Sequence, residues 1–328
     1  MRENILTVTD LRTYYHSRTR VVPAVDGVDL TLARGEMLGI VGESGCGKST
    51  IARTLLGLVD PAYTKIEGGT ALFKGVDLLK LGTRALNRIR GREISMIFQN
   101  PLTSLNPVYT VENQISEVLK IHARMSHREM HARCLELMRL VGIPAPEERL
   151  RDYPHQLSGG MQQRVLIAIA LACDPDIVIA DEPTTALDVT IQAQILDLIR
   201  DINRRMGMGM ILISHNMGII AEMCDRIMVM YGGVTVEEGD VVSVFRNPKH
   251  PYTKGLLAAI PSIEEDREAL FTIQGTVPRF AHPVRFCRFA DRCEWAREEC
   301  RSAEPPLIAL ADGRRIRCVL FREGGEVT

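Results

Sequence analysis

The sequence has no apolar segment long enough to cross a membrane. A spanning helix needs about 20 consecutive, mostly apolar residues, and the purest apolar run, Val165 to Cys173, is far shorter. The uncharged stretch from Ile94 to Val111 contains two prolines and several amide side chains. The N-terminus lacks the apolar core and small-residue cleavage site of a secretory signal. These absences predict a cytoplasmic protein that would reach a membrane only by docking on other subunits.

The sequence also lacks an excess of either charge. Its 40 basic and 41 acidic residues leave a formal net charge of −1, whereas nucleic-acid-binding domains usually carry basic surfaces. With 45% hydrophobic and 25% charged residues over 328 positions, the composition is that of a soluble globular protein. The length allows one large domain plus a smaller appendage, and we find no internal repeat.

The apolar pattern alternates between short strands and longer helices. Runs typical of buried strands occur around residues 37–41, 94–98, 177–180 and 210–213. Helical spacing and capping signals predict helices over residues 49–58, 111–122, 126–140, 159–172 and 189–205, and from 216 onward. This alternation predicts a mainly parallel sheet flanked by helices, with a helical insert near residues 111–175. Pro261 and the charged run from Glu264 to Glu268 then indicate a linker to a cysteine-bearing tail.

A glycine-rich segment between a predicted strand and a predicted helix has the spacing of a phosphate-binding P-loop. Its glycines let the backbone curl so that successive N–H groups face phosphate oxygens, and the following helix adds its dipole. Lys48 would supply a positive charge to the β and γ phosphates, and the Ser49 hydroxyl would ligate Mg²⁺. A chance glycine loop is disfavoured because the full pattern stands in the right context. The predicted ATP-binding residues here are Gly42, Ser44, Gly45, Cys46, Gly47, Lys48, Ser49 and Thr50.

Two adjacent carboxylates end the predicted strand that begins at Ile177. The carboxyl ends of parallel strands are where ligands bind in such sheets. Asp181 would hold Mg²⁺, through water, and Glu182 would polarise the attacking water as a general base. An ordinary strand followed by an acidic turn is the alternative, and the P-loop upstream argues against it.

The segment from Leu157 to Arg164 (LSGGMQQR) resembles the signature motif of the ABC (ATP-binding cassette) ATPases. It opens a predicted helix and lies about 20 residues before the carboxylate pair. The resemblance implies that Ser158, Gly159 and Gly160 contact the γ-phosphate of an ATP molecule held by a partner subunit.

Further residues resemble the remaining ABC motifs in their order along the chain. Gln99 resembles the glutamine that senses the γ-phosphate and Mg²⁺ and faces the membrane subunits, and Asp188 falls in a segment resembling the D-loop. His215 resembles the switch histidine that binds the γ-phosphate. The resemblance thus implies catalytic roles for Gln99 and His215. Tyr15 lies where the family stacks an aromatic ring on adenine, although Tyr14 is adjacent and packing roles for both stay open.

Longer segments resemble the dipeptide/oligopeptide importer family of ABC ATPases, over nearly the whole chain. They cover residues 98–107 (FQNPLTSLNP), 153–160 (YPHQLSGG), 181–190 (DEPTTALDVT) and 250–257 (HPYTKGLL). Ser214 and Asn216 depart from the usual residues around the switch histidine. The implied fold is α/β: a P-loop NTPase of the ABC type, with a RecA-like mainly parallel sheet, an antiparallel β subdomain and a helical insert. The ATPase domain would span residues 1–262, its helical signature subdomain residues 100–164, and a C-terminal extension residues 263–328.

One chain carries one P-loop and one signature, so a single copy cannot complete an ATP site. The resemblance implies a head-to-tail pair with a second ATPase subunit, related but distinct, with a homodimer as the alternative. It further implies two transmembrane permease subunits, an extracytoplasmic solute-binding protein, no nucleic acid, and a peripheral position on the cytoplasmic face of the inner membrane. The implied function is ATP hydrolysis, with Mg²⁺, that powers import of peptides or a related solute.

Four of the eight cysteines cluster near the C-terminus, at Cys287, Cys293, Cys300 and Cys318. In a cytosolic chain such clustering favours metal ligation over disulfides. Zinc sites usually use pairs about two to four residues apart, and these gaps are wider. They resemble the cysteine set that holds a [4Fe–4S] cluster in several peptide-importer ATPases, and four thiolates suit that cluster. Zinc, or free regulatory thiols, remain the alternatives. Cys46, inside the P-loop, is predicted to be exposed to oxidation.

Two other functions compete with the importer. A soluble ABC ATPase acting on nucleic acid or ribosomes would often carry two cassettes, long insertions and basic surfaces, which this chain lacks. An inactive regulatory cassette is disfavoured because Lys48, Ser158, Asp181, Glu182 and His215 are all present.

Overall fold

The structure of the protein, a computed structural model, describes residues 3–185, 187–260, 273–278, 280–322 and 325–326. The predicted linker at Pro261 and Glu264 to Glu268 lies outside these ranges. The chain divides into two units. Unit 1 comprises residues 1–3, 33–36 and 80–212, and unit 2 comprises residues 4–32, 37–79 and 213–328.

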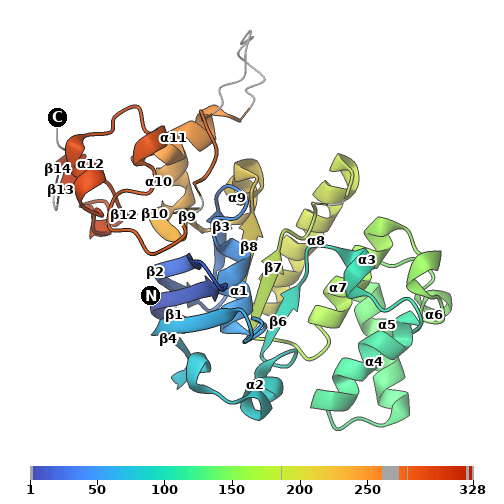
Figure 1. The fold of residues 1–328 in the computed structure, drawn as a ribbon. Coiled ribbons are helices and arrows are strands. Elements are labelled where there is room, and N and C mark those ends of the chain that lie inside the picture. The colour runs from blue at the N-terminus through green and yellow to red at the C-terminus, as the bar shows by residue number, and fades with distance from the viewer. Residues whose placement is uncertain (1–2, 186, 261–272, 279, 323–324, 327–328) are drawn as a thin grey trace. The chain divides into compact units, whose positions relative to one another are not determined.

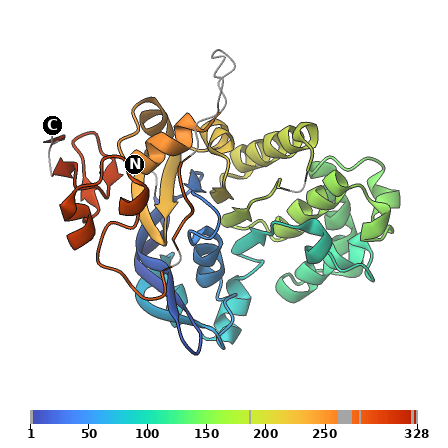
Figure 2. The same ribbon diagram turned by 45° about the horizontal axis from the view of Figure 1, so that its top comes forward.

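Unit 1 combines buried strands with a group of helices. Strand β6 (Ile94–Ile97) pairs in parallel with β7 (Ile177–Asp181), and β7 also neighbours β8 (Gly209–Ser214), which continues into unit 2. Figures 1 and 2 both show α3 to α7 gathered into one helical group. The helices are α2 (Thr83–Ile89), α3 (Pro101–Ser104), α4 (Val111–His122), α5 (His127–Leu140), α6 (Pro146–Arg149), α7 (Gly159–Ala170) and α8 (Val189–Met206), with a 3₁₀ turn at Pro154–Gln156. A further 3₁₀ turn, Leu78–Lys80, begins in unit 2 and ends at the first residue of this part of unit 1.

Local capping explains where the helices of unit 1 begin. The Ser126 hydroxyl accepts the backbone N–H of Glu129, whose carboxylate accepts the N–H of Ser126 in return, so a complete capping box starts α5. Helix α8 ends at Gly207, which takes the left-handed conformation that favours glycine. These ends agree closely with those predicted from the sequence.

Unit 2 contains an antiparallel sheet with the order β2-β1-β4-β5. Its strands are β1 (Asn4–His16), β2 (Val21–Ala33), β4 (Thr64–Phe73) and β5 (Val76–Asp77). In β1 and β2 buried residues alternate with more exposed ones, which is typical of a sheet with one solvated face.

A second group of strands in unit 2 is built around β3 (Met37–Val41), whose five residues are all buried. Strand β3 pairs in parallel with β9 (Arg226–Tyr231), and the order continues antiparallel through β10 (Val234–Asp240) and β12 (Arg315–Ile316) to β11 (Ile308–Ala309). The helices of the unit are α1 (Lys48–Leu55), α9 (Met217–Met223), α10 (Val241–Arg246), α11 (Pro251–Ala258) and α12 (Glu298–Ser302), with a 3₁₀ turn at Ala290–Arg292 and a hairpin of β13 (Phe321–Arg322) and β14 (Gly325–Glu326).

The predicted strands and helices are confirmed with small shifts at their ends. Helix α1 starts at Lys48 and stops at Leu55, earlier than predicted, because Gly57 turns into the left-handed region. The sheet that contains these strands is mixed. Parallel pairing joins β3 with β9 and β6 with β7, whereas β9, β10, β12 and β11 pair antiparallel.

The C-terminal extension is built into unit 2 by strand pairing. In the β10–β12 ladder Glu237 lies opposite Ile316 and Glu238 opposite Arg315, and the Arg315 guanidinium also forms an ion pair with Glu238. Arg314, whose side chain is 4% exposed, lies 3.6 Å from the buried Glu237 carboxylate. Strand pairing and ion pairs therefore hold the extension, whatever its cysteines bind.

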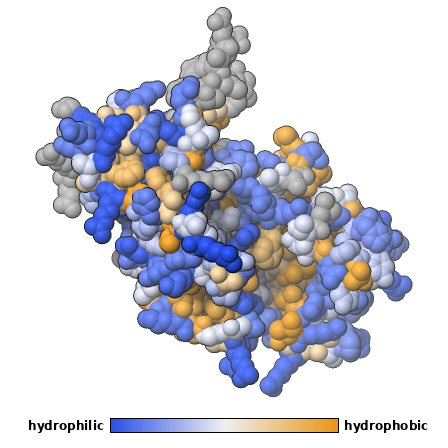
Figure 3. Space-filling view, in the orientation of Figure 1, coloured by the Kyte–Doolittle hydropathy of each residue, from blue (hydrophilic) through white to orange (hydrophobic). Residues whose placement is uncertain are grey.

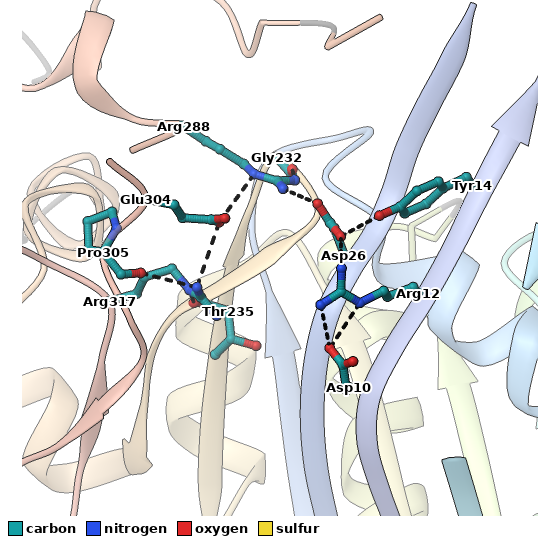
Figure 4. A network of polar contacts seen from close by, with 10 residues as sticks. All are labelled: Asp10, Arg12, Tyr14, Asp26, Gly232, Thr235, Arg288, Glu304, Pro305 and Arg317. Atoms are coloured by element: carbon teal, nitrogen blue, oxygen red, sulfur yellow. Dashed lines mark hydrogen bonds and ion pairs between the residues drawn. The ribbon is translucent and has the colours of Figure 1, made fainter. Parts of the chain in front are cut away.

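A polar network joins the extension to the antiparallel sheet (Figure 4). The buried Arg288 guanidinium donates to the Asp26 carboxylate and to the Gly232 carbonyl. Asp26 also accepts the Tyr14 hydroxyl at 2.6 Å and lies 3.6 Å from Arg12. Glu304 lies 3.7 Å from both Arg288 and Arg317. The extension is therefore held against the antiparallel sheet by its buried Arg288, which pairs with Asp26 of β2.

The face of the molecule in Figure 3 is mostly hydrophilic, with small apolar patches. Apolar residues that unit 1 leaves exposed include Phe98, Val108, Tyr109 and Tyr153. None of the helices in the described ranges combines the length and the apolar character that a bilayer-crossing helix requires.

Candidate nucleotide site

The predicted P-loop connects the end of β3 to the start of α1, as a phosphate-binding loop requires. Gly47 has φ of +104°, and a Cβ there would lie 2.1 Å from the Ala24 carbonyl oxygen. A Cβ at Gly42 would lie 2.2 Å from the Met230 carbonyl oxygen. Both positions therefore exclude any larger residue, because backbone atoms cannot move aside as a side chain can.

Lys48 is the first residue of α1, and its side chain folds back over the loop. The Nζ atom donates to the carbonyl oxygens of Gly42 at 2.7 Å and Glu43 at 3.1 Å. The residue is 5% exposed. The loop thus holds its own cation at the point where a helix N-terminus favours anions.

The prediction that Cys46 is exposed to oxidation is wrong. Cys46 is 0% exposed, and burial raises the pKa of its thiol above the ordinary value. Because the thiolate is the oxidisable form, a buried thiol with a raised pKa reacts slowly. The Lys48 Nζ lies 3.8 Å from its Sγ. The P-loop spacing places this residue in the loop, but the loop turns its side chain inward.

The two neighbouring tyrosines of β1 have different surroundings. Tyr14 is 8% exposed, and burial together with its hydrogen bond to Asp26 raises its pKa to about 12. The hydroxyl of Tyr15 lies 3.1 Å from Oγ1 of Thr50 in α1. Tyr15 is therefore the tyrosine beside the P-loop helix, whereas Tyr14 belongs to the core.

In unit 1 the structure brings Gln99 and Glu182 together. The Gln99 side-chain amide donates to Oε2 of Glu182 at 2.9 Å, and the Thr185 hydroxyl donates to the same oxygen at 2.9 Å. Asp181 ends β7 and is 3% exposed, and Glu182 follows with φ of +47°. A non-glycine residue at positive φ is uncommon and often marks a functional turn.

The predicted signature and D-loop residues start helices α7 and α8, which precede and follow β7 in the chain. The Ser158 side chain accepts the N–H of Met161 and caps α7, and the Asp188 side chain accepts the N–H of Ile191 and caps α8. Gly159 and Gly160 form the first turn of α7, and a Cβ at Gly160 would lie 2.7 Å from Ile191 Cγ2. Gly160 is thus required for the close approach of the two helices.

His215 is exposed on the turn between β8 and α9. The residues on either side form this turn: the Ser214 hydroxyl accepts the N–H of Asn216 at 3.0 Å, and the Asn216 side chain caps α9 by accepting the N–H of Gly218 at 2.8 Å. The two residues that depart from the usual family sequence therefore keep a polar, capped turn around the histidine.

Sequence reasoning missed the residues that hold the candidate groups in place. Thr185 lies in a segment noted for its resemblance, but its bond to Glu182 was not anticipated. Arg292 and Tyr252 both bind Glu43 of the P-loop. No sequence signal pointed to them, because Arg292 and Glu43 are 249 positions apart.

The four clustered cysteines lie near one another in the extension. Burial raises the pKa of Cys287 to about 11, with smaller contributions from Cys300 and Cys293, and burial raises that of Cys318 to about 12, with contributions from the other three thiols. The Cys287 N–H donates to the Cys300 carbonyl at 2.8 Å. However, no group of three or more histidine, cysteine or acidic side chains in the described ranges is arranged to hold a metal ion. The predicted metal site is therefore not confirmed.

Comparisons with known proteins agree with this geometry. Residues 25–185 match the family model described as "ABC transporter", and residues 236–300 match "Oligopeptide/dipeptide transporter, C-terminal region". The chain is 48% identical over 315 residues to a probable peptide ABC transporter ATP-binding protein of Sinorhizobium fredii, covering 96% of this chain and 94% of that one. The chain belongs to the ATP-binding subunits of peptide ABC transporters.

Two relatives from Bacillus subtilis support the same family assignment. The oligopeptide transport ATP-binding protein AppD is 46% identical, with 98% of both chains covered. The dipeptide transport ATP-binding protein DppD is also 46% identical, with 99% of this chain and 97% of that one covered.

Among solved structures, the ATP-binding cassette MJ0796, a dimer in a post-hydrolysis state bound to ADP and Pi, is 29% identical with a TM-score of 0.65. The match covers 72% of this chain and 98% of that one. As a member of this ABC family, the chain is an ATPase with the fold of an ABC nucleotide-binding domain, made of mixed α/β sheets.

Proposed function

We propose that this chain hydrolyses ATP to power the import of peptides, or of a related solute, through a multi-subunit ABC transporter. The observation that carries the proposal is that one chain combines an ABC ATPase region with an oligopeptide/dipeptide transporter C-terminal region. Relatives similar over nearly the whole chain are named for transport of peptides, oligopeptides and dipeptides.

ATP would be held by the loop from Gly42 to Thr50, with Lys48 moving from the loop carbonyls to the β and γ phosphates. Tyr15 would stack on the adenine. The Ser49 hydroxyl would ligate Mg²⁺ and Asp181 would hold it through water, and the bound ion would neutralise charge on the phosphates. The loop glycines would bring backbone N–H groups close to the phosphate oxygens.

Glu182 would act as the general base that takes a proton from the attacking water. Its bonds to Gln99 and Thr185 support this role, because they hold the carboxylate in one orientation. His215 would bind the γ-phosphate. Ser158, Gly159, Gly160 and Asp188 would act on the ATP molecule of a partner subunit.

The domain organisation we propose is an ATPase domain over residues 1–262, with its helical signature subdomain at 100–164, and an extension over 263–328. A second, distinct ATPase subunit would complete both ATP sites. Two permeases and an extracytoplasmic solute-binding protein would complete the transporter, and the chain would lie peripherally on the cytoplasmic face of the membrane. The exposed Phe98, Val108 and Tyr109 near Gln99 support docking of a permease on unit 1.

Uptake of labelled dipeptides and oligopeptides by a deletion strain tests the function. We expect uptake to be lost on deletion and restored by the wild-type gene. The Lys48→Ala gene should not restore uptake, because the P-loop lysine is required for binding the phosphates of ATP. Unchanged uptake of every peptide tested in the deletion strain would rule out peptides as cargo.

We further propose that Cys287, Cys293, Cys300 and Cys318 form a thiolate site for a [4Fe–4S] cluster, with zinc as the alternative. The clustering of the four cysteines within residues 287–318 and the thiolate chemistry of the cluster support this proposal. The test is to measure the amounts of iron, acid-labile sulfide and zinc per chain after anaerobic purification. About four iron and four sulfide are expected for one such cluster. Zinc alone would identify the alternative, and absence of all three would refute a metal site.

A further inference from the structure

An arginine of the C-terminal extension contacts the P-loop directly. Arg292 Nη1 lies 2.7 Å from Oε2 of Glu43, and its Nη2 lies 3.1 Å from Oε1. This is a bidentate pair, the strongest common geometry for an arginine and a carboxylate. The Arg292 side chain is 7% exposed and that of Glu43 is 28% exposed, so solvent screens the pair only partly.

The guanidinium of Arg292 is itself held in a fixed position. Its remaining hydrogen bonds go to the carbonyl oxygens of Ile273 at 3.2 Å, Gln274 at 2.8 Å and Gly275 at 3.2 Å, and to the Tyr231 hydroxyl at 3.4 Å. All three guanidinium nitrogens are therefore engaged. A lysine could not make these bonds, because its ammonium is a point charge without the planar fork.

Glu43 is held at its backbone as well as at its side chain. The N–H of Glu43 donates to the Tyr252 hydroxyl at 2.9 Å. Tyr252 is 0% exposed, and its ring packs against Tyr231 at 4.7 Å and against Phe289 of the extension at 5.4 Å. The Glu43 carbonyl in turn accepts Lys48 Nζ at 3.1 Å. A continuous series of contacts thus runs from the extension to the lysine of the P-loop.

We propose that Arg292 is a positioning residue for nucleotide binding, acting through Glu43 to hold the P-loop in its phosphate-binding shape and to neutralise the Glu43 carboxylate. The inference rests on the proposed function, because it assumes that ATP binds this loop. A loop held in its binding conformation before the ligand arrives loses less entropy on binding.

The second part of the role is electrostatic. An open pocket of about 750 Å³ is lined by Glu43, Ser44 and Arg292 and by residues 273 and 275–278. Without Arg292, the Glu43 carboxylate has room to move and stands unpaired beside a loop that must accept phosphate. The negative charge of the Glu43 carboxylate would then repel the negative charge of the phosphates. Loss of the arginine should therefore harm ATP binding more than loss of the whole charge pair.

The test is titration of the full-length chain with a fluorescent ATP analogue and Mg²⁺. We expect Arg292→Gln to bind the analogue about tenfold more weakly, as for loss of a partly buried charge-assisted pair. The double variant Glu43→Gln/Arg292→Gln should recover to within about threefold of wild type, because it removes the unpaired carboxylate. Arg292→Lys, which keeps the charge and the fold, should bind about threefold more weakly, since it lacks the fork.

Arg301→Gln is the matched control. Arg301 lies in the same extension, is 60% exposed and lies 3.9 Å from an exposed Asp291, so its loss should leave the affinity unchanged. Wild-type affinity in both Arg292→Gln and Arg292→Lys would overturn the inference. So would equal weakening in Arg292→Gln and the double variant, which would indicate a purely structural role. The Lys48→Ala variant distinguishes failure of this inference from failure of the proposed ATP site. The ATP site itself would be refuted if the wild-type chain bound no nucleotide, or if Lys48→Ala bound the analogue as tightly as wild type.

Discussion

Replacing Glu182 by glutamine is expected to slow ATP turnover by about 10²–10⁴-fold while leaving ATP binding intact, as for loss of a general base. Glutamine keeps the size of the side chain and one oxygen that can accept the bonds from Gln99 and Thr185. It cannot take a proton from water. The reaction would therefore stop with ATP bound.

The measurement is phosphate release by the assembled transporter, paired with binding of a fluorescent ATP analogue. Glu136→Gln serves as control, because Glu136 is a 66% exposed residue of α5 that forms an ion pair with Arg133 of the same helix. Its turnover should equal that of wild type. If Glu182→Gln turned over ATP at the wild-type rate, Glu182 would not be the general base. If the variant failed to bind ATP, Glu182 would be needed to bind the nucleotide and not to activate the attacking water.

Replacing Asp26 by alanine is expected to reduce the free energy of unfolding by about 3 kcal/mol, because breaking a buried ion pair leaves its partner charge uncompensated. The Arg288 side chain is 1% exposed, and that of Asp26 is 10% exposed. Glu304, at 3.7 Å from Arg288, offsets only part of the loss. Tyr14 would also lose the acceptor of its buried hydroxyl.

Urea unfolding of the full chain measures this effect. The control is Asp197→Ala, which removes a 65% exposed partner of Arg200 in α8 and should change the free energy by less than about 1 kcal/mol. Asp26→Asn should fall between wild type and Asp26→Ala, since it keeps hydrogen bonds but not the charge. If Asp26→Ala were no more destabilised than the control, the network in Figure 4 would not be what anchors the extension.

Local features of this protein were readable from the sequence. The P-loop spacing, the capping box at Ser126 and the apolar strand before Asp181 all involve residues close together in the chain. Their structure follows from contacts within a few positions, and such contacts are encoded by residue type and spacing. The order of the ABC motifs then predicted which residues would bind ATP.

Other features depend on packing between distant segments. The Cys46 side chain is buried because of how β3, α1 and the chain around Met230 pack together. The P-loop sequence pattern would be the same if this side chain were exposed. The sequence predicted the extension as a cysteine-bearing tail and gave no sign of how it packs. The extension pairs with β10 and is tied to β2 through Arg288.

The sequence by itself determined the ATPase class, the catalytic candidates and most helix and strand ends. Only the tertiary structure decided that Gln99 and Thr185 hold Glu182, and that Arg292 holds Glu43. The physical reason is that contacts between distant residues leave no periodic or local signal. Arg292 and Glu43 are 249 positions apart and Gln99 and Glu182 are 83 apart, so each pair meets only when the segments between them have packed. Thr185 is three positions from Glu182, but its bond depends on the turn at Glu182, where φ is +47°.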